Sequence, residues 1–303
     1  MIILGGSSRE KCFNDFWILT IKNSINLAFK WKNLKINDNC STITPRFGST
    51  MVFTNNKIYI HGGQDLNQNF YADLFEVEII KNKENEYDSV NFIKNHVLYP
   101  LSLNKYPSER NSHCSYLSDN DLLLFGGGNS SGLIDDMWIF SNNEFNKIKG
   151  NYTGLEMTGI TLFKSKIYIF GGREIEKISD KIRIYNYDKE NLCNSLSDTI
   201  QMPFSISSYA YCTHKEFFII YGGIENDKFS THIKVYNMES SKWYFYNKQI
   251  NIDASICPIM VNDDQIIIIF GGSSIQSESN QLTILNINDI INESNLIDIS
   301  LIK

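Results

Sequence analysis

The chain has few of the residues that indicate a secreted or nucleic-acid-binding protein. Its 303 residues include 6 cysteines and 5 prolines, and the formal net charge is −6. Because the cysteines are scattered without a CxxC pair, we interpret them as reduced thiols of a cytoplasmic protein, with the nucleus as an alternative location. An acidic chain lacks the clustered lysines and arginines that displace counterions from phosphates, so no nucleic-acid partner is expected.

Long hydrophobic runs are also missing. The longest strongly apolar run, residues 266–270, is far shorter than the about 20 residues that cross a bilayer. Gly5 follows the first four residues directly, which leaves no space for the apolar region of a signal peptide. We therefore expect no membrane attachment.

Catalytic and metal-binding motifs are equally scarce. The sequence contains no HExxH, no GxSxG and no P-loop. The histidines lie in separate contexts, and His61 is interpreted as a core or channel-wall residue. Cys212 and His214, two residues apart, would share one face of a strand without further ligands nearby in the sequence. The sequence predicts no catalytic residue, no metal and no cofactor.

What the chain does contain is an apolar, strand-like segment that runs into a Gly-Gly pair, six times over. The pairs recur every about 45 to 64 residues, a spacing that indicates propeller blades. Only glycine adopts positive φ freely and lets neighbouring backbone approach without a Cβ clash, so the pairs are predicted to be structural. They are Gly5 and Gly6, Gly62 and Gly63, Gly126 and Gly127, Gly171 and Gly172, Gly222 and Gly223, and Gly271 and Gly272.

A second strand with alternating apolar residues begins ten or eleven positions after each pair. Carboxylates recur just before this strand, and their repetition indicates a structural role at a turn. They are Asp15, Asp73, Asp135 and Asp136. The charged tract at residues 81–86 is interpreted as a solvated hairpin tip.

These repeats resemble those of the kelch-repeat family. The shared features are the apolar run into Gly-Gly, a downstream aromatic such as Trp243, and an arginine that opens the preceding strand, Arg46 and Arg110. The resemblance implies an all-β fold, a six-bladed β-propeller with four antiparallel strands per blade in one domain, residues 1–303. The expected blades are residues 1–36, 45–98, 109–149, 156–196, 205–248 and 253–303.

In this assignment of strands to blades, blade one lacks its innermost strand, because the sequence begins at Met1 with the second strand. Residues 296–301 are predicted to form an outer strand of blade six and not the missing inner strand of blade one. An inner strand would have to begin at the opposite face, and the seven residues from 288 to 294 reach at most about 23–25 Å when fully extended. A bare inner edge would favour aggregation. We therefore expect the natural protein to continue upstream of Met1.

The loops after the second strand and before the first strand of a blade emerge at the same end, and we call this end the loop face. We expect a non-enzymatic, monomeric interaction scaffold there, alone or as the substrate-recruiting module of a larger protein. Two arginines would pair with carboxylates of an acidic peptide. The expected partner-binding residues are Arg46, Arg110, Tyr99, Tyr106, Arg9, Lys11, Arg173 and Lys228. The alternative is an enzyme that acts on a small molecule such as a sugar at the channel mouth.

Overall fold

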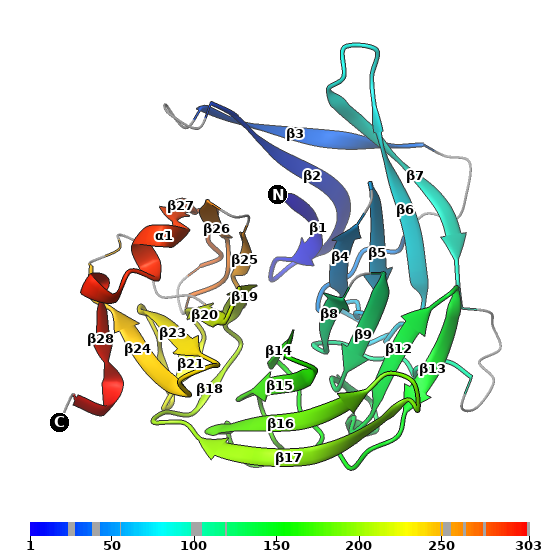
Figure 1. The fold of residues 1–303 in the computed structure, drawn as a ribbon. Coiled ribbons are helices and arrows are strands. Elements are labelled where there is room, and N and C mark those ends of the chain that lie inside the picture. The colour runs from blue at the N-terminus through cyan, green and yellow to red at the C-terminus, as the bar shows by residue number, and fades with distance from the viewer. Residues whose placement is uncertain are drawn as a thin grey trace. The chain divides into compact units, whose positions relative to one another are not determined.

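The computed structural model describes residues 1–23, 28–37, 43–54, 56–97, 105–118, 120–248, 250, 256–262, 265–274 and 277–301. They form two compact units, unit 1 with residues 1–156 and unit 2 with residues 157–303. Both units consist almost entirely of β-strands (Figure 1). Within the described ranges, no helix is long and apolar enough to cross a membrane. The all-β fold predicted from the sequence is confirmed.

The larger sheet of unit 1 has seven strands in the order β1-β2-β3-β7-β6-β5-β4. Its strands are β1 (Ile2–Ser7), β2 (Cys12–Asn23), β3 (Ala28–Asn37), β4 (Thr50–Thr54), β5 (Lys57–His61), β6 (Leu74–Lys81) and β7 (Tyr87–Asn95). Neighbours are antiparallel except β3 and β7, which pair in parallel over residues 35–37 and 89–91. Within the described residues β1 is the edge strand, as predicted for blade one.

The second sheet of unit 1 has four antiparallel strands in the order β13-β12-β9-β8, with a short hairpin beside it. The sheet contains β8 (Cys114–Ser118), β9 (Asp121–Phe125), β12 (Met137–Ser141) and β13 (Glu144–Ile148), and the hairpin contains β10 (Gly128–Asn129) and β11 (Gly132–Leu133). Every side chain of β9 is buried, which explains the continuous apolar run over residues 122–125 that follows Asp121.

Unit 2 contains sheets in the orders β14-β15-β16-β17, β18-β21-β22, β19-β20-β23-β24-β28 and β25-β26-β27. Their strands are β14 (Gly159–Phe163), β15 (Lys166–Phe170), β16 (Lys181–Asp188), β17 (Cys193–Gln201), β18 (Ile206–Ser207), β19 (Ala210–His214), β20 (Phe217–Tyr221), β21 (Ile224–Glu225), β22 (Lys228–Phe229), β23 (Ile233–Asn237), β24 (Lys242–Tyr246), β25 (Ile259–Asn262), β26 (Ile266–Phe270), β27 (Leu282–Asn286) and β28 (Leu296–Asp298). Its short helices are α1 (Ile287–Ile290), η1 (Glu293–Asn295) and η2 (Ile299–Leu301).

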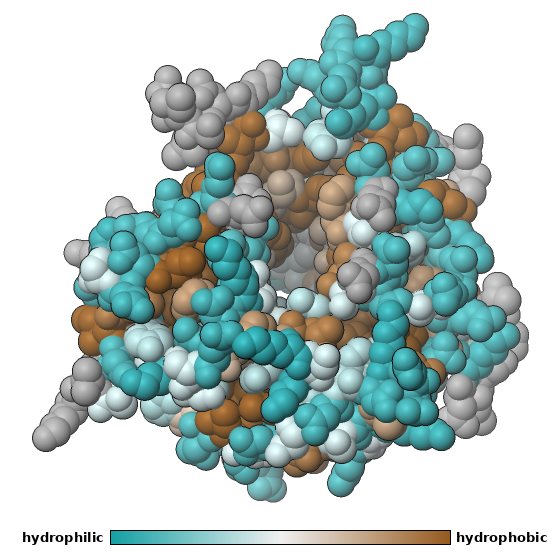
Figure 2. All heavy atoms as spheres, in the orientation of Figure 1, coloured by the Kyte–Doolittle hydropathy of each residue, from teal (hydrophilic) through white to brown (hydrophobic). Residues whose placement is uncertain are grey.

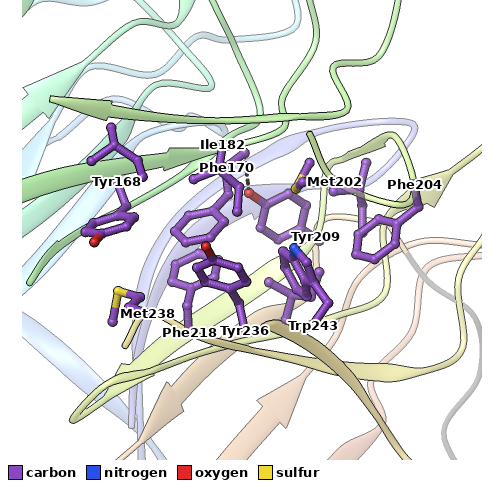
Figure 3. Packing of buried hydrophobic residues seen from close by; sticks show 13 residues of the cluster. Tyr168, Phe170, Ile182, Met202, Phe204, Tyr209, Phe218, Tyr236, Met238 and Trp243 are labelled. Carbon is purple, nitrogen blue, oxygen red and sulfur yellow. Dashed lines mark hydrogen bonds between the residues drawn. The ribbon is translucent and has the colours of Figure 1, made fainter. Parts of the chain in front are cut away.

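Aromatic side chains fill the core between the β15 and β20 sheets of unit 2 (Figure 3). The rings of Phe170 and Phe218 stack with centroids 3.8 Å apart, and Tyr236 and Trp243 meet the same cluster edge-on. The Tyr209 hydroxyl donates to the Phe170 carbonyl oxygen over 2.6 Å. A buried tyrosine thus keeps its polar atom satisfied inside an apolar core.

In unit 1, each glycine pair connects its repeat to the segment that opens the next repeat. The first glycine has positive φ, and a Cβ on Gly62 would lie 2.6 Å from the carbonyl oxygen of Arg110. The second glycine donates its N–H across the same junction, from Gly63 to Arg110 over 2.8 Å and from Gly127 to Leu155 over 2.8 Å. The predicted close approach of neighbouring backbone at the pairs is confirmed here.

The C-terminal strand lies elsewhere than predicted. β28 pairs with β24, the outer strand of blade five, through Tyr244 and Asp298, Phe245 and Ile297, and Tyr246 and Leu296. The prediction of an outer strand on blade six is therefore wrong. Helix α1 follows β27 directly and buries Ile287 and Ile290, which redirects the chain toward β24.

The charged tract at residues 81–86 forms the turn between β6 and β7, as predicted. The Asn82 N–H donates to the Glu86 carbonyl oxygen over 2.8 Å, while Lys83, Glu84 and Asn85 are exposed. The hairpin tip projects as a hydrophilic extension at the top of Figure 2. It contributes no side chain to the buried core clusters.

Candidate functional site

Arg46, the first of the two predicted partner-binding arginines, is enclosed inside unit 1. Its side chain is 2 % exposed, and it donates to both carboxylate oxygens of Asp73 over 2.5 and 3.0 Å. It also donates to the carbonyl oxygens of Gly62 and Thr44 and lies 3.9 Å from the ring centroid of Tyr71. Arg46 therefore holds the entry of β4 to the end of β5.

Arg110 repeats this arrangement one blade later. It is 0 % exposed and donates to Asp136 over 2.7 Å and to the Gly126 carbonyl oxygen over 3.1 Å. Trp138 donates its indole N–H to the other oxygen of Asp136 over 2.9 Å. Burial disfavours the charged carboxylate, but the Arg110 charge and these hydrogen bonds outweigh it and hold the pKa of Asp136 below its ordinary value.

The sequence-based placement of both arginines at an accessible rim is therefore corrected. Asp73 and Asp136, two of the carboxylates interpreted as structural, already neutralise them. A buried guanidinium with a paired charge has no free donor surface for an acidic peptide. Sequence reasoning assigned the arginines and the aspartates separately and missed that they are partners.

The next two blades contain buried ion pairs that sequence reasoning missed. Arg183 donates to Glu174 over 2.7 Å, and Lys234, which is 0 % exposed, donates to Glu225 over 2.8 Å. Burial lowers the pKa of Lys234, with the Glu225 charge opposing it. In both blades the acid follows the second glycine by two residues and the base by eleven. This shared spacing is the sequence pattern from which the two ion pairs could have been predicted.

The remaining predicted residues fall into three groups. Arg9, Lys11, Arg173 and Lys228 are exposed in turns that follow the glycine pairs. Tyr106 is half-buried and meets the ring of Phe145 edge-on, with centroids 6.3 Å apart. Tyr99 lies outside the described residues.

A groove of about 520 Å³ opens on the loop face of unit 2. Its walls come from the turn between β15 and β16, the segment before β18, and the turn between β21 and β22. The lining residues are Glu176, Lys177, Ile178, Asp180, Gln201, Met202, Pro203, Phe204, Ser205, Asn226 and Asp227. We call this the unit 2 groove.

The base of the unit 2 groove is rigid. Met202 and Phe204 are 2 % and 4 % exposed and belong to the aromatic core, where Phe204 meets Trp243 edge-on at 5.0 Å (Figure 3). The backbone N–H of Met202 donates to the Asp180 carbonyl oxygen over 2.7 Å. Packed side chains and hydrogen-bonded backbone thus fix the floor before any ligand arrives.

An apolar residue stands at the tip of one groove wall. Ile175 is 89 % exposed, the most exposed of the large hydrophobic side chains in the described residues. It lies in the turn between Glu174 and Lys177, which is closed by a hydrogen bond from the Glu174 N–H to the Lys177 carbonyl oxygen over 2.8 Å. Ile175 thus projects into solvent next to the lining residues Glu176 and Lys177.

Two buried histidines meet in unit 1 although they are distant in sequence. His61 Nδ1 lies 2.9 Å from His113 Nε2, which is also 3.0 Å from the Thr50 hydroxyl. Burial, together with the positive charge of Arg110, lowers the pKa of His113 to about 3 and that of His61 well below its usual range. The interpretation of His61 as a core residue is confirmed.

Among the side chains that the structure describes, no three or more histidines, cysteines, aspartates or glutamates lie together in a group able to hold a metal ion. Cys212 and His214 both point into the buried face of β19, as predicted.

Comparison with known proteins agrees with the repeats. The KLHDC2/KLHL20/DRC7 Kelch-repeats domain matches residues 1–159, just over half of the chain. No curated protein matches the chain. The Gly-Gly strands, their registered third strands and this match together show that the chain belongs to the kelch-repeat family, whose fold is a β-propeller.

Proposed function

We propose that the chain is a non-enzymatic interaction module that holds a segment of a partner protein in the unit 2 groove. It acts alone or as the substrate-recruiting part of a larger assembly. Kelch-repeat domains commonly mediate binding between proteins, which supports the class of function. The observation that carries the choice of site is the exposed Ile175 beside a preformed groove of about 520 Å³.

In protein interfaces, a few side chains contribute most of the binding energy. A few anchors that become fully desolvated dominate affinity, while surrounding polar contacts exclude water. Ile175 supplies an apolar anchor, and the rigid floor at Phe204 supplies a surface that needs no ordering on binding. The earlier expectation of an acidic peptide depended on Arg46 and Arg110, whose charges are paired internally, so it is not part of this proposal.

The cellular location in this proposal is the cytoplasm or nucleus, and the module acts as a monomer. Among the cysteines that the structure describes, Cys12, Cys114, Cys193, Cys212 and Cys257 are free thiols. Free thiols are the usual state in reducing compartments, which supports the location.

Affinity purification followed by mass spectrometry tests the function. Wild-type protein is compared with Ile175→Ser and with the control Leu196→Ser, which removes an exposed apolar residue from the outer strand β17. We expect specific partners to be retained by wild type and by the control and to be depleted by Ile175→Ser. Equal recovery on all three proteins would contradict the proposed site.

A further inference from the structure

We propose that the unit 2 groove selects a basic partner segment, an extended stretch of another protein that carries two or more lysine or arginine side chains. This inference rests on the proposed function and adds the chemistry of the partner. The exposed Arg173 and Lys228 taken alone would suggest an acidic partner, and this inference assigns the partner the opposite charge.

The groove presents carboxylates that have no cationic partner of their own. Glu176, Asp180 and Asp227 line it, and none of them forms an ion pair with any residue that the structure describes. The single lysine of the lining, Lys177, lies 3.9 Å from Glu174 Oε2, so its charge is partly offset. The groove therefore has a surplus of negative charge.

Each carboxylate stands on a separately anchored stretch of backbone. Asp227 is the second residue of the two-residue turn between β21 and β22, where Asn226 and Asp227 both have positive φ. The Asn226 side chain accepts the N–H of Ser205 over 3.1 Å, which ties this turn to the groove floor. The carbonyl oxygen of Asp180 accepts the N–H of Met202.

The neighbouring ion pairs show why these three acids are different. Glu174 and Glu225 lie on the same loops, but each already has a cationic partner. Arg183 pairs with Glu174, and Lys234 pairs with Glu225. The three acids of the lining form no ion pair with a described residue, so a cation of a bound segment could pair with them. Arginine suits such a site, because its planar guanidinium binds carboxylates in a bidentate manner and its stem can cover apolar surface such as Pro203.

The volume limits the occupant to a short stretch of chain. A groove of about 520 Å³ is in the range that accommodates a small ligand or a few side chains, not a folded domain. An extended segment also leaves its apolar side chains free to contact Ile175 at the wall tip.

Peptide display on the immobilised full-length chain tests the inference. A random peptide library is selected against wild type, and the most enriched peptide is then titrated by fluorescence anisotropy. The groove variant carries Glu176→Gln, Asp180→Asn and Asp227→Asn. A matched control carries Glu84→Gln, Glu144→Gln and Glu190→Gln, the same charge change at exposed positions away from the groove.

We expect enriched sequences to contain at least two basic residues and to lose affinity about tenfold or more in the groove variant. The control should change affinity less than about twofold, and Lys177→Gln should strengthen binding. Enrichment of acidic or uncharged peptides whose binding is lost in Ile175→Ser would overturn the basic-partner inference and leave the proposed function standing. Basic peptides that bind all variants equally would also overturn the inference. A failure to enrich any peptide would contradict both.

Discussion

The backbone carbonyl oxygen of Arg110 accepts a hydrogen bond from the N–H of Gly63 over 2.8 Å, while its guanidinium donates to Asp136 and Gly126. One residue thus connects the end of β5 to the end of β9 through both its backbone and its side chain. Arg46 makes the equivalent connection from Gly6 to Gly62 and Asp73. The two arginines are therefore part of the blade junctions of unit 1.

Arg110→Met should lower the free energy of unfolding by about 3 kcal/mol, because it removes a buried ion pair and leaves the half-buried Asp136 carboxylate with the exposed Lys147, 3.6 Å away, as its remaining cation. Denaturant unfolding followed by tryptophan fluorescence measures the change. Lys83→Met, an exposed control, should change stability by less than about 0.5 kcal/mol. Equal, small effects for both variants would show that Arg110 is not structural. By the same reasoning, charge reversal of Arg46 and Arg110 together should prevent folding.

Gly62→Ala should destabilise the protein more than Gly132→Ala. Both glycines have positive φ, so both substitutions strain the backbone, but only the Gly62 Cβ would meet the Arg110 carbonyl oxygen at 2.6 Å. Gly132 has open space around the added atom. We expect a loss of about 1 kcal/mol or slightly more for Gly132→Ala and several kcal/mol for Gly62→Ala. Melting temperatures of the two variants decide the ranking, and a reversed order would contradict the junction geometry.

Stability should fall as the pH decreases below about 6.5, because His61 and His113 are buried as neutral rings. Their pKa values are lowered in the folded state, so the unfolded chain binds protons first as the pH falls and is stabilised relative to the native state. The contribution is fully present above the unfolded pKa and declines by about 1.4 kcal/mol per pH unit for each histidine.

Urea unfolding between pH 7.5 and 5.5 checks this dependence. The double variant His61→Phe and His113→Thr uses residues that occupy the corresponding positions of other blades, Phe125 and Thr158. It should flatten the pH profile, whereas His232→Asn, which changes an exposed histidine, should leave the profile unchanged. A wild-type profile that is flat over this range would contradict neutral burial.

Replacement of residues 82–86 by Asn-Gly should leave the melting temperature within about 2 °C of wild type. The tip is exposed, and the backbone and side-chain hydrogen bonds of Asn82 lie within the turn. A two-residue turn can join Lys81 to Tyr87, which already pair across the hairpin. Loss of soluble expression would show that the tip is required by the neighbouring strands.

The repeat was readable from the sequence because each element has a local signal. Gly126 and Gly127 follow four apolar residues, and positive φ at both positions favours glycine there. The third strand of each repeat could be located because apolar and polar residues alternate along it. A six-blade count remains a prediction, as do the blade boundaries.

The candidate site was less accessible to sequence reasoning, because ion pairing between distant residues leaves no local pattern. Arg46 and Asp73 are separated by more than twenty residues, and nothing in either segment shows which partner is chosen. Arg46 was therefore assigned to the surface although it is buried. The pairing of β28 with β24 depended on a helical turn at Asn286, whose side chain accepts the N–H groups of Asn288 and Asp289. The exposure of Ile175 depends on the conformation of its turn, which the sequence alone does not show.

Site-specific photo-cross-linking tests the central claim, that partners bind at the unit 2 groove, most directly. A photoreactive phenylalanine analogue is placed at Ile175 or, as a control, at Leu196, which is 55 % exposed on the outer strand β17. The account predicts discrete cross-linked protein bands in cells from position 175, diminished by excess unlabelled wild type, and none from position 196. Discrete bands from position 196 together with none from position 175 would contradict it.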